Sequence, residues 1–200
     1  MNPEPGLRER KKQRTRETIA RVALELFEER GYHATTLADI AEAADVSTRT
    51  IFSYYPSKED ILFAEFPALK AAFARALDER PGGKDALETV RDFMLSAAHL
   101  EKGPLHGRRE QIIESDETLR SHKRARLAQI EELVAAAVAR DLDAGEDDLR
   151  PRLVAASLVA AVAVFDRGAG QASAPEEIAA IVDALISFLR GGVHALTPPS

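Results

Sequence analysis

Side chains that form hydrogen bonds gather in one seventeen-residue stretch, VSTRTIFSYYPSKEDIL, at residues 46–62. Its hydroxyl and basic groups do not follow any catalytic motif, but they are well suited to binding. An arginine such as Arg49 can donate two hydrogen bonds to a guanine, and hydroxyl groups can reach phosphates or base edges. The chemistry that this stretch indicates is therefore recognition of nucleic acid.

The rest of the sequence lacks the spacing that catalysis requires. Cysteine is absent, and the five histidines show no metal-ligand pattern such as His-Glu-x-x-His. Gly168-Ala-Gly170 lacks the third glycine and the preceding strand of a dinucleotide loop, and no serine lies in a nucleophile elbow. We therefore expect no catalytic residue, no metal and no cofactor, and an all-helical enzyme remains the less favoured alternative.

Charge is distributed unevenly along the 200 residues, whose net charge is −6. Residues 1–58 hold ten Lys/Arg against nine Asp/Glu, and the remainder holds seventeen against twenty-four. Six basic residues crowd between Arg8 and Arg16, with only Glu9 opposing them. We interpret this cluster as a basic arm, centred on Lys11 and Lys12, that follows DNA; a solvated basic tail is the alternative.

The sequence predicts neither a secretory signal nor a membrane span. The first twenty residues are polar and basic rather than apolar. The longest apolar run, at residues 153–165, is shorter than the roughly 20 residues that cross a bilayer. We expect a cytoplasmic protein with no membrane partner.

Apolar residues recur at helical spacing almost throughout, and no segment alternates with the period of a strand, so the predicted fold class is all-α. A first helix carries apolar residues 19–27 and ends at Gly31. Thr36-Leu-Ala-Asp39 is a capping box that opens a short helix, and Ser47 caps a further helix over residues 48–54. Pro56 ends that helix.

Two short helices joined by a tight turn form a helix-turn-helix, whose second helix lies in the major groove of DNA. The inner face of this helix, Ile51, Phe52 and Tyr55, is predicted to pack on the first two helices. Lys58 and Thr36 lie at helix starts, where free N–H groups favour a phosphate. The alternative is that the polar residues merely face water. The predicted DNA-binding residues are Lys11, Lys12, Thr36, Ser47, Thr48, Arg49, Thr50, Ser53, Tyr54 and Lys58.

Beyond residue 56 the pattern predicts longer helices, near residues 85–100, 105–114, 117–142, 147–166 and 175–190. Pro151 and Pro175 fit because each falls in a first helical turn. Pro67 instead lies inside the helix that starts at Ser57, so we expect a kink near residues 66–68 that links the two parts of the chain. The predicted domains are a DNA-binding domain over 1–56 and a ligand-binding and dimerisation domain over 57–200.

One pattern of residue types and spacings comprises Thr36, Ile40, Ala41, Ala44, Val46, Ser47, Thr50, Phe52, Tyr54, Tyr55, Ser57, Lys58 and Leu62. On these residues, and over about residues 15–65, the sequence resembles the TetR family of transcriptional regulators. Asp45 departs from the family in standing where glycine is usual in the turn, and Arg49 replaces a common glycine in the recognition helix. Phe52 occupies a position often held by a phosphate-binding tyrosine, so we assign it no such contact. The resemblance implies a repressor that a small molecule releases from a pseudo-palindromic operator in double-stranded DNA.

Residues 106–133 and 147–162 are similar to a TetR subgroup regarded as binding acyl-CoA-like ligands, which includes the mycofactocin-associated regulators. We expect an apolar pocket whose basic mouth either meets a phosphate-bearing head or pairs with neighbouring glutamates. A DNA-binding dimer without a ligand is the alternative. The candidate ligand-binding residues are Phe93, Met94, Ala97, Leu100, Arg108, Arg109, Ile112, Lys123, Arg124, Leu127, Ile130 and Phe165.

Two-fold related half-sites require a homodimer. The predicted helices at residues 147–166 and 175–190 carry apolar stripes wider than one small core uses, so we expect them to pair with their copies as four helices. The alternative is that both stripes face inward within one chain. The candidate interface residues are Leu158, Val162, Ile181, Leu185 and Leu189.

Overall fold

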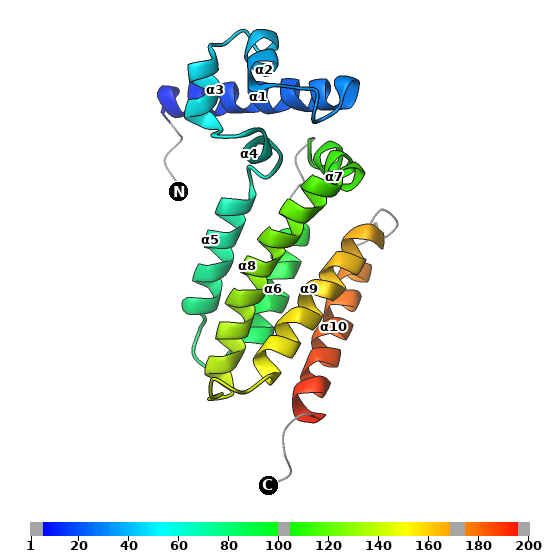
Figure 1. Ribbon diagram of the computed structural model, residues 1–200. Coiled ribbons are helices and arrows are strands. Elements are labelled where there is room, and N and C mark those ends of the chain that lie inside the picture. Colours follow the sequence, from blue (N-terminus) through cyan, green and yellow to red (C-terminus); the bar gives the residue numbers. More distant parts are fainter. Residues whose placement is uncertain (1–5, 100–104, 169–174, 196–200) are drawn as a thin grey trace. The chain divides into compact units, whose positions relative to one another are not determined.

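The computed structural model describes residues 6–99, 105–168 and 175–195, and every regular element within these ranges is a helix (Figure 1). The all-α prediction is confirmed. Leu100 and Gly170 lie outside the described residues, as does the side chain of Phe165. The helices are α1 (Leu7–Arg30), α2 (Leu37–Ala43), α3 (Thr48–Tyr54), α4 (Lys58–Leu62), α5 (Phe66–Asp78), α6 (Ala86–His99), α7 (His106–Ser115), α8 (Glu117–Asp141), α9 (Arg150–Gly168) and α10 (Pro175–Ala195).

The chain divides into two compact units. The first comprises residues 1–66 and 102–123, and the second comprises residues 67–101 and 124–200. The first unit is therefore larger than the predicted domain over 1–56, because it also contains α4, α7 and the first turns of α8.

The first unit is built around α1, which packs against α2, α4 and α7, while α2 packs against α3. Its core draws one or two buried residues from each of these short helices, so no single helix could bury its apolar face alone. The core residues with the least exposure are Ile19, Ala23, Leu24, Ile40, Ile51, Ile61 and Leu119.

The predicted helix caps are present. The Thr36 hydroxyl accepts a hydrogen bond from the Asp39 N–H (3.1 Å), and an Asp39 carboxylate oxygen accepts one from the Thr36 N–H (2.7 Å), which completes the capping box. Ser47 Oγ accepts from the Thr50 N–H at 3.1 Å and starts α3. Asp45 adopts φ 53°, a left-handed geometry that aspartate tolerates better than most residues, so it can replace glycine in the turn.

The expected kinked helix around Pro67 is instead two separate helices, and that prediction was wrong. α4 ends at Leu62, residues 63–65 form a turn, and α5 begins at Phe66. Pro67 is the second residue of α5, where the missing N–H would have had no helical partner in any case. The proline therefore starts a new helix rather than bending an old one.

The second unit consists of α5, α6, most of α8, α9 and α10, with α10 packed against α6 and α9. Val134, Ala137 and Val138 of α8 are buried in its core, whereas Leu127 and Ile130 are half-buried. Ion pairs join helices at its surface, among them Arg91–Asp183 at 2.5 Å between α6 and α10. Pro151 lies in the first turn of α9 and Pro175 begins α10, as predicted.

None of the helices, across the described residues, is long and apolar enough to cross a membrane. The same residues contain no cluster of three or more His, Cys, Asp or Glu side chains arranged to hold a metal ion.

Candidate nucleic-acid interface

The recognition-helix candidate, α3, exposes one continuous face. Thr48, Arg49, Phe52 and Ser53 are exposed, and their spacing places them on the same side of the helix. Within the described part of the chain, the Arg49 guanidinium makes no ion pair and no hydrogen bond. Its donors are therefore open to an external acceptor.

The opposite face of α3 is held firmly to α1. Ile51 is fully buried, and Tyr55, which follows the last residue of α3, is 2% exposed. The Tyr55 hydroxyl donates to the Arg16 carbonyl oxygen (3.2 Å), and the Arg16 guanidinium lies 5.1 Å from the centre of the Tyr55 ring. Burial raises the pKa of Tyr55, while Arg16 offsets part of that increase. These contacts fix the orientation of α3, and with it the direction in which its exposed side chains project.

Phe52 does not join this inner face, which corrects the prediction. Its side chain is 54% exposed, whereas Ile51 and Tyr55 are buried. A seven-residue helix can bury only a narrow stripe, and positions 51 and 55 already fill it. The sequence alone could not decide which of the adjacent apolar residues at 51 and 52 would turn inward.

Thr50 and Tyr54 are half-buried, and Tyr54 packs against the core. The hydroxyls of Thr36 and Ser47 serve as helix caps, as described above. Ser53 Oγ donates to the Thr50 carbonyl oxygen at 2.7 Å. Among the predicted polar contacts of α3, Thr48 and Arg49 thus have the side chains most available for a ligand.

The predicted basic arm is helical rather than extended, because α1 already begins at Leu7. Arg8, Lys11, Lys12 and Thr15 share one side of α1, at spacings of three and four residues, and no acidic residue interrupts them. Lys11 and Lys12 are both exposed. The two lysines therefore belong to a basic surface near the N-terminal end of α1.

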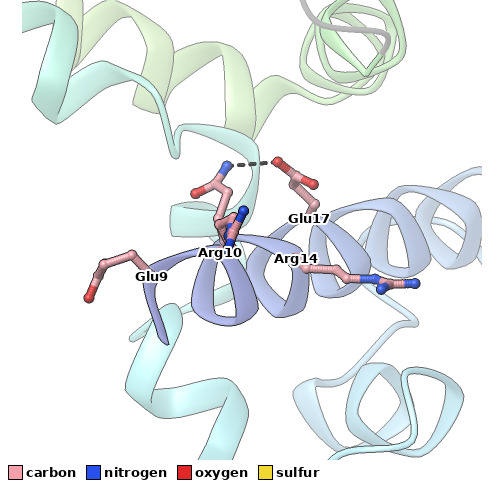
Figure 2. Close-up of a pocket in the computed structure, with 5 residues that line it drawn as sticks. Glu9, Arg10, Arg14 and Glu17 are labelled. Atoms are coloured by element: carbon pink, nitrogen blue, oxygen red, sulfur yellow. Dashed lines mark hydrogen bonds between the residues drawn. The ribbon is translucent and has the colours of Figure 1, made fainter. Parts of the chain in front are cut away.

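Another side of α1 carries mixed charge (Figure 2). A shallow open depression is lined there by Glu9, Arg10, Gln13, Arg14 and Glu17. Gln13 donates a 2.8 Å hydrogen bond to the Glu17 carboxylate. The two carboxylates make this side a poorer phosphate surface than the side with Lys11 and Lys12.

Lys58 has an internal role that the sequence did not reveal. Its ammonium donates to the carbonyl oxygens of Tyr32 (2.8 Å) and Thr35 (2.7 Å), and it lies 4.4 Å from the centre of the Tyr32 ring. These contacts connect α4 to the loop between α1 and α2. Two of the three ammonium N–H groups are thus used within the first unit.

We expect Lys58→Met to destabilise the first unit by about 1.5–3 kcal/mol, because two carbonyl groups lose a charged donor. Thermal unfolding followed by circular dichroism measures this loss. Lys12→Met is the matched control: it removes an exposed lysine, so it should leave the melting temperature unchanged while it weakens DNA binding and reduces the salt dependence of that binding. An unchanged melting temperature for Lys58→Met would contradict the internal role.

The basic residues assigned to a ligand's head group are already paired within the first unit. Arg108 forms a bidentate ion pair with Glu28 of α1, in which Arg108 Nε lies 2.7 Å from Glu28 Oε1. The hydrogen bonds from Arg108 lower the pKa of Glu28. Arg109 pairs with Glu65 at 2.5 Å. These two pairs attach α7 to the helix-turn-helix unit, a connection that no local sequence pattern predicts.

Lys123 donates to Glu110 (2.7 Å) and Glu114 (3.1 Å). Burial disfavours its charge, but the two carboxylates outweigh that effect and raise the pKa of Lys123. Arg124 is exposed on α8. Of the two sequence-based alternatives for this group, the pairing of Lys123 with neighbouring glutamates is the one seen.

The apolar ligand candidates are divided between the two units. Ile112 is buried in the core of the first unit. Phe93, Met94 and Ile130 are partly buried against the core of the second, and Phe93 lies 4.7 Å from Phe73 between ring centres. Ala97 and Leu127 are half-buried in the same second unit. Any pocket that we assign from these residues is therefore restricted to the second unit.

Two of the five predicted interface residues are unavailable to a partner. Leu158 and Leu189 are each 3% exposed and belong to the core of the second unit. Val162 and Leu185 are partly buried, and Ile181 is exposed. The large apolar residues that do face outward include Leu153 and Val164 of α9 and Phe188 of α10, the last 71% exposed.

Comparison with known proteins decides the family. Residues 19–64 match the model of the tetR family of bacterial regulatory proteins, and residues 84–194 match the MftR C-terminal domain. The chain belongs to the TetR family. TcmR of Streptomyces glaucescens, an HTH-type transcriptional regulator, is 36% identical over 178 residues, which cover 82% of this chain and 76% of TcmR.

Solved structures share the TetR fold. NalD of Pseudomonas aeruginosa, the secondary repressor of the MexAB-OprM multidrug efflux pump, superposes with a TM-score of 0.62 and 23% identity over 90% of this chain and 97% of NalD. The SmeT–triclosan complex gives 0.60 and 20% identity over 93% and 96%. Membership of the TetR family, shown by the family model and by TcmR, makes this protein a DNA-binding transcriptional regulator. Proteins of this family bind operators and small-molecule effectors and are not enzymes.

Proposed function

We propose that this TetR regulator binds a pseudo-palindromic operator as a homodimer, reads bases with the exposed face of α3, and leaves the operator when a small amphipathic molecule binds. The observation that supports DNA binding by α3 is the Arg49 guanidinium, which has no partner among the described residues and lies on the exposed side of a well-anchored helix. An arginine in that position can bind O6 and N7 of guanine together. Lys11 and Lys12 are assigned to the phosphates.

Replacing Arg49 by alanine is expected to weaken operator binding by about 1–3 kcal/mol and to relax base preference at one position in each half-site. The measurement is selection of bound sequences from a random duplex pool, followed by titration of the selected duplex. Arg75→Ala, which removes an equal charge from an exposed site on α5, should leave the selected sequence unchanged. If Arg49→Ala selects the same sequence with the same strength, base reading by Arg49 is wrong.

The outward apolar residues support the homodimer. Leu153 and Val164 lie on the exposed side of α9, and Ile181 and Phe188 lie on the exposed side of α10. Most of the exposed residues between them are small, namely Ala156, Ser157 and Ala160 on α9 and Ala184 and Ser187 on α10. Exposure of these apolar side chains to water is unfavourable, and packing of the face against its own copy about a two-fold axis would bury them. We therefore assign the interface to these outward residues rather than to Leu158 and Leu189.

We propose that the effector binds within the second unit. Phe93, Met94 and Ile130 are apolar and only partly buried, which suits a fatty chain. The match to the MftR C-terminal domain and the triclosan complex of SmeT support a small-molecule ligand of apolar character. We propose an acyl-CoA-like molecule as the class to test first. Such a ligand can release the protein from DNA only if it binds the DNA-free conformation more tightly than the DNA-bound conformation.

Titration of acyl-CoAs of increasing chain length into the protein–operator complex tests this class. We expect release that strengthens with chain length, because each added methylene buries further apolar surface, worth about 0.8 kcal/mol. Free coenzyme A is the control and should have no effect. Absence of release at every length, with operator binding intact, would favour the ligand-independent dimer instead.

A further inference from the structure

The exposed face of α3 contains one apolar ring among polar side chains. Phe52 is 54% exposed, and Thr48, Arg49 and Ser53 surround it on the same side of the helix. Its ring contacts no other aromatic ring in the described residues and takes no part in the core of the first unit. An exposed phenylalanine at the centre of a binding face points to a bound state in which something apolar covers it.

We propose that Phe52 reads the 5-methyl group of a thymine in the operator. This inference rests on the proposed function, because it requires α3 to enter the major groove. The major-groove edges of the four base pairs present hydrogen-bond donors and acceptors, and the thymine methyl is the apolar group among them. A phenyl ring that enters that groove beside Arg49 therefore has one apolar partner to meet.

Rigid support makes such a contact selective. Ile51 and Tyr55 fix the inner face of α3 in the core, and Ser47 caps its start. Phe52 consequently projects from a helix whose rotation about its own axis is restricted. Because Arg49 lies three residues earlier, its guanidinium and the Phe52 ring lie side by side on one helical surface, so they should contact nearby base pairs.

A sugar or phosphate contact is a poorer explanation for the ring. Phenylalanine has no group that donates to a phosphate, and the neighbouring Thr48 and Arg49 already supply such donors on the same face. Contact with a thymine methyl, in contrast, removes apolar surface from water on both partners. The proposal therefore makes Phe52 a specificity-determining residue rather than an affinity residue.

Replacement of thymine by deoxyuridine tests this directly, since it removes the methyl group and leaves every hydrogen-bonding atom in place. The operator is first selected with the full-length wild-type protein, and each thymine of a half-site is then replaced singly and symmetrically. We expect one thymine per half-site at which the change weakens wild-type binding about fourfold per half-site, the effect of one buried methyl, or roughly fifteenfold for both.

Phe52→Ala should bind the thymine and deoxyuridine duplexes equally at that position, while any sensitivity at other thymines persists. Phe52→Leu, which keeps an apolar group, should retain part of the discrimination. Because the ring is exposed, the melting temperature of Phe52→Ala should match that of the wild type.

Two outcomes overturn the inference. In one, wild type and Phe52→Ala lose equal affinity at each deoxyuridine; in the other, no half-site thymine is sensitive to loss of its methyl group. Both leave the proposed function standing, since a sequence has still been selected. Failure of the wild type to select any sequence would overturn the proposed function itself, together with this inference.

Discussion

The Phe188→Asp protein is expected to sediment as a monomer at micromolar concentration and to bind the full operator at least about a hundredfold more weakly. Phe188 is 71% exposed in a single chain, so the substitution should not disturb the fold. In a dimer, however, it would bury a carboxylate in an apolar interface, where an unpaired charge is strongly disfavoured. The loss of affinity follows because a monomer engages one half-site and forfeits the local concentration of the second.

Sedimentation velocity and titration of whole and half operators measure the two effects together. Leu69→Asp is the matched control, because it places the same charge at an exposed apolar site on α5. That variant should remain dimeric. Val164→Asp on α9 should behave like Phe188→Asp. A wild-type chain that is itself monomeric under these conditions would refute the dimer, and a dimeric Phe188→Asp would place the interface elsewhere.

Tyr55→Ala is expected to cost about 3–5 kcal/mol of unfolding free energy, the range found when a buried aromatic side chain is truncated. Tyr55 is 2% exposed and holds the end of α3 against α1 through its ring and its hydroxyl. A loss of this size is a large share of the 5–15 kcal/mol that stabilises a typical domain. Operator binding should therefore be lost along with the fixed position of α3.

Two variants separate the contributions of the Tyr55 side chain. Tyr55→Phe removes only the hydroxyl that donates to Arg16, so it should cost about 0.5–1.5 kcal/mol. Phe52→Ala removes a ring of similar size from an exposed site on α3, three residues before Tyr55, and should cost little. Urea unfolding followed by circular dichroism provides the free energies. If Tyr55→Ala and Phe52→Ala are equally stable, the anchoring role of Tyr55 is wrong.

The local structure of the helix-turn-helix could be predicted because it depends on neighbours in sequence. Thr36, Ser47 and Gly31 act on backbone groups within a few residues, so their roles as helix ends follow from residue type and spacing. The left-handed geometry of Asp45 is equally local. The exposed position of Arg49 also follows from the helical period once Ile51 is placed inside.

Features that depend on distant parts of the chain were not predictable in this way. The pairing of Arg108 with Glu28 joins residues eighty positions apart, and Lys58 contacts carbonyl groups in a loop more than twenty residues earlier. Apolar periodicity on α9 and α10 indicated two buried faces but not which residues each would bury, so Leu158 was placed outside and Phe188 was passed over. The break before Pro67 arises because α4 ends at Leu62. A proline is compatible both with a kink inside a helix and with the first turn of a new helix, so its presence did not predict this end.

The grouping of α7 with the helix-turn-helix limits how this regulator could be recombined. Ile112 and Ile113 of α7, and Leu119 at the start of α8, are part of the core around α1. A chimera that exchanges residues 1–66 between relatives would separate that core from three of its apolar members and from the partners of Glu28 and Glu65. The exchangeable module is discontinuous in sequence, so a functional graft has to carry residues 102–123 along with the first 66.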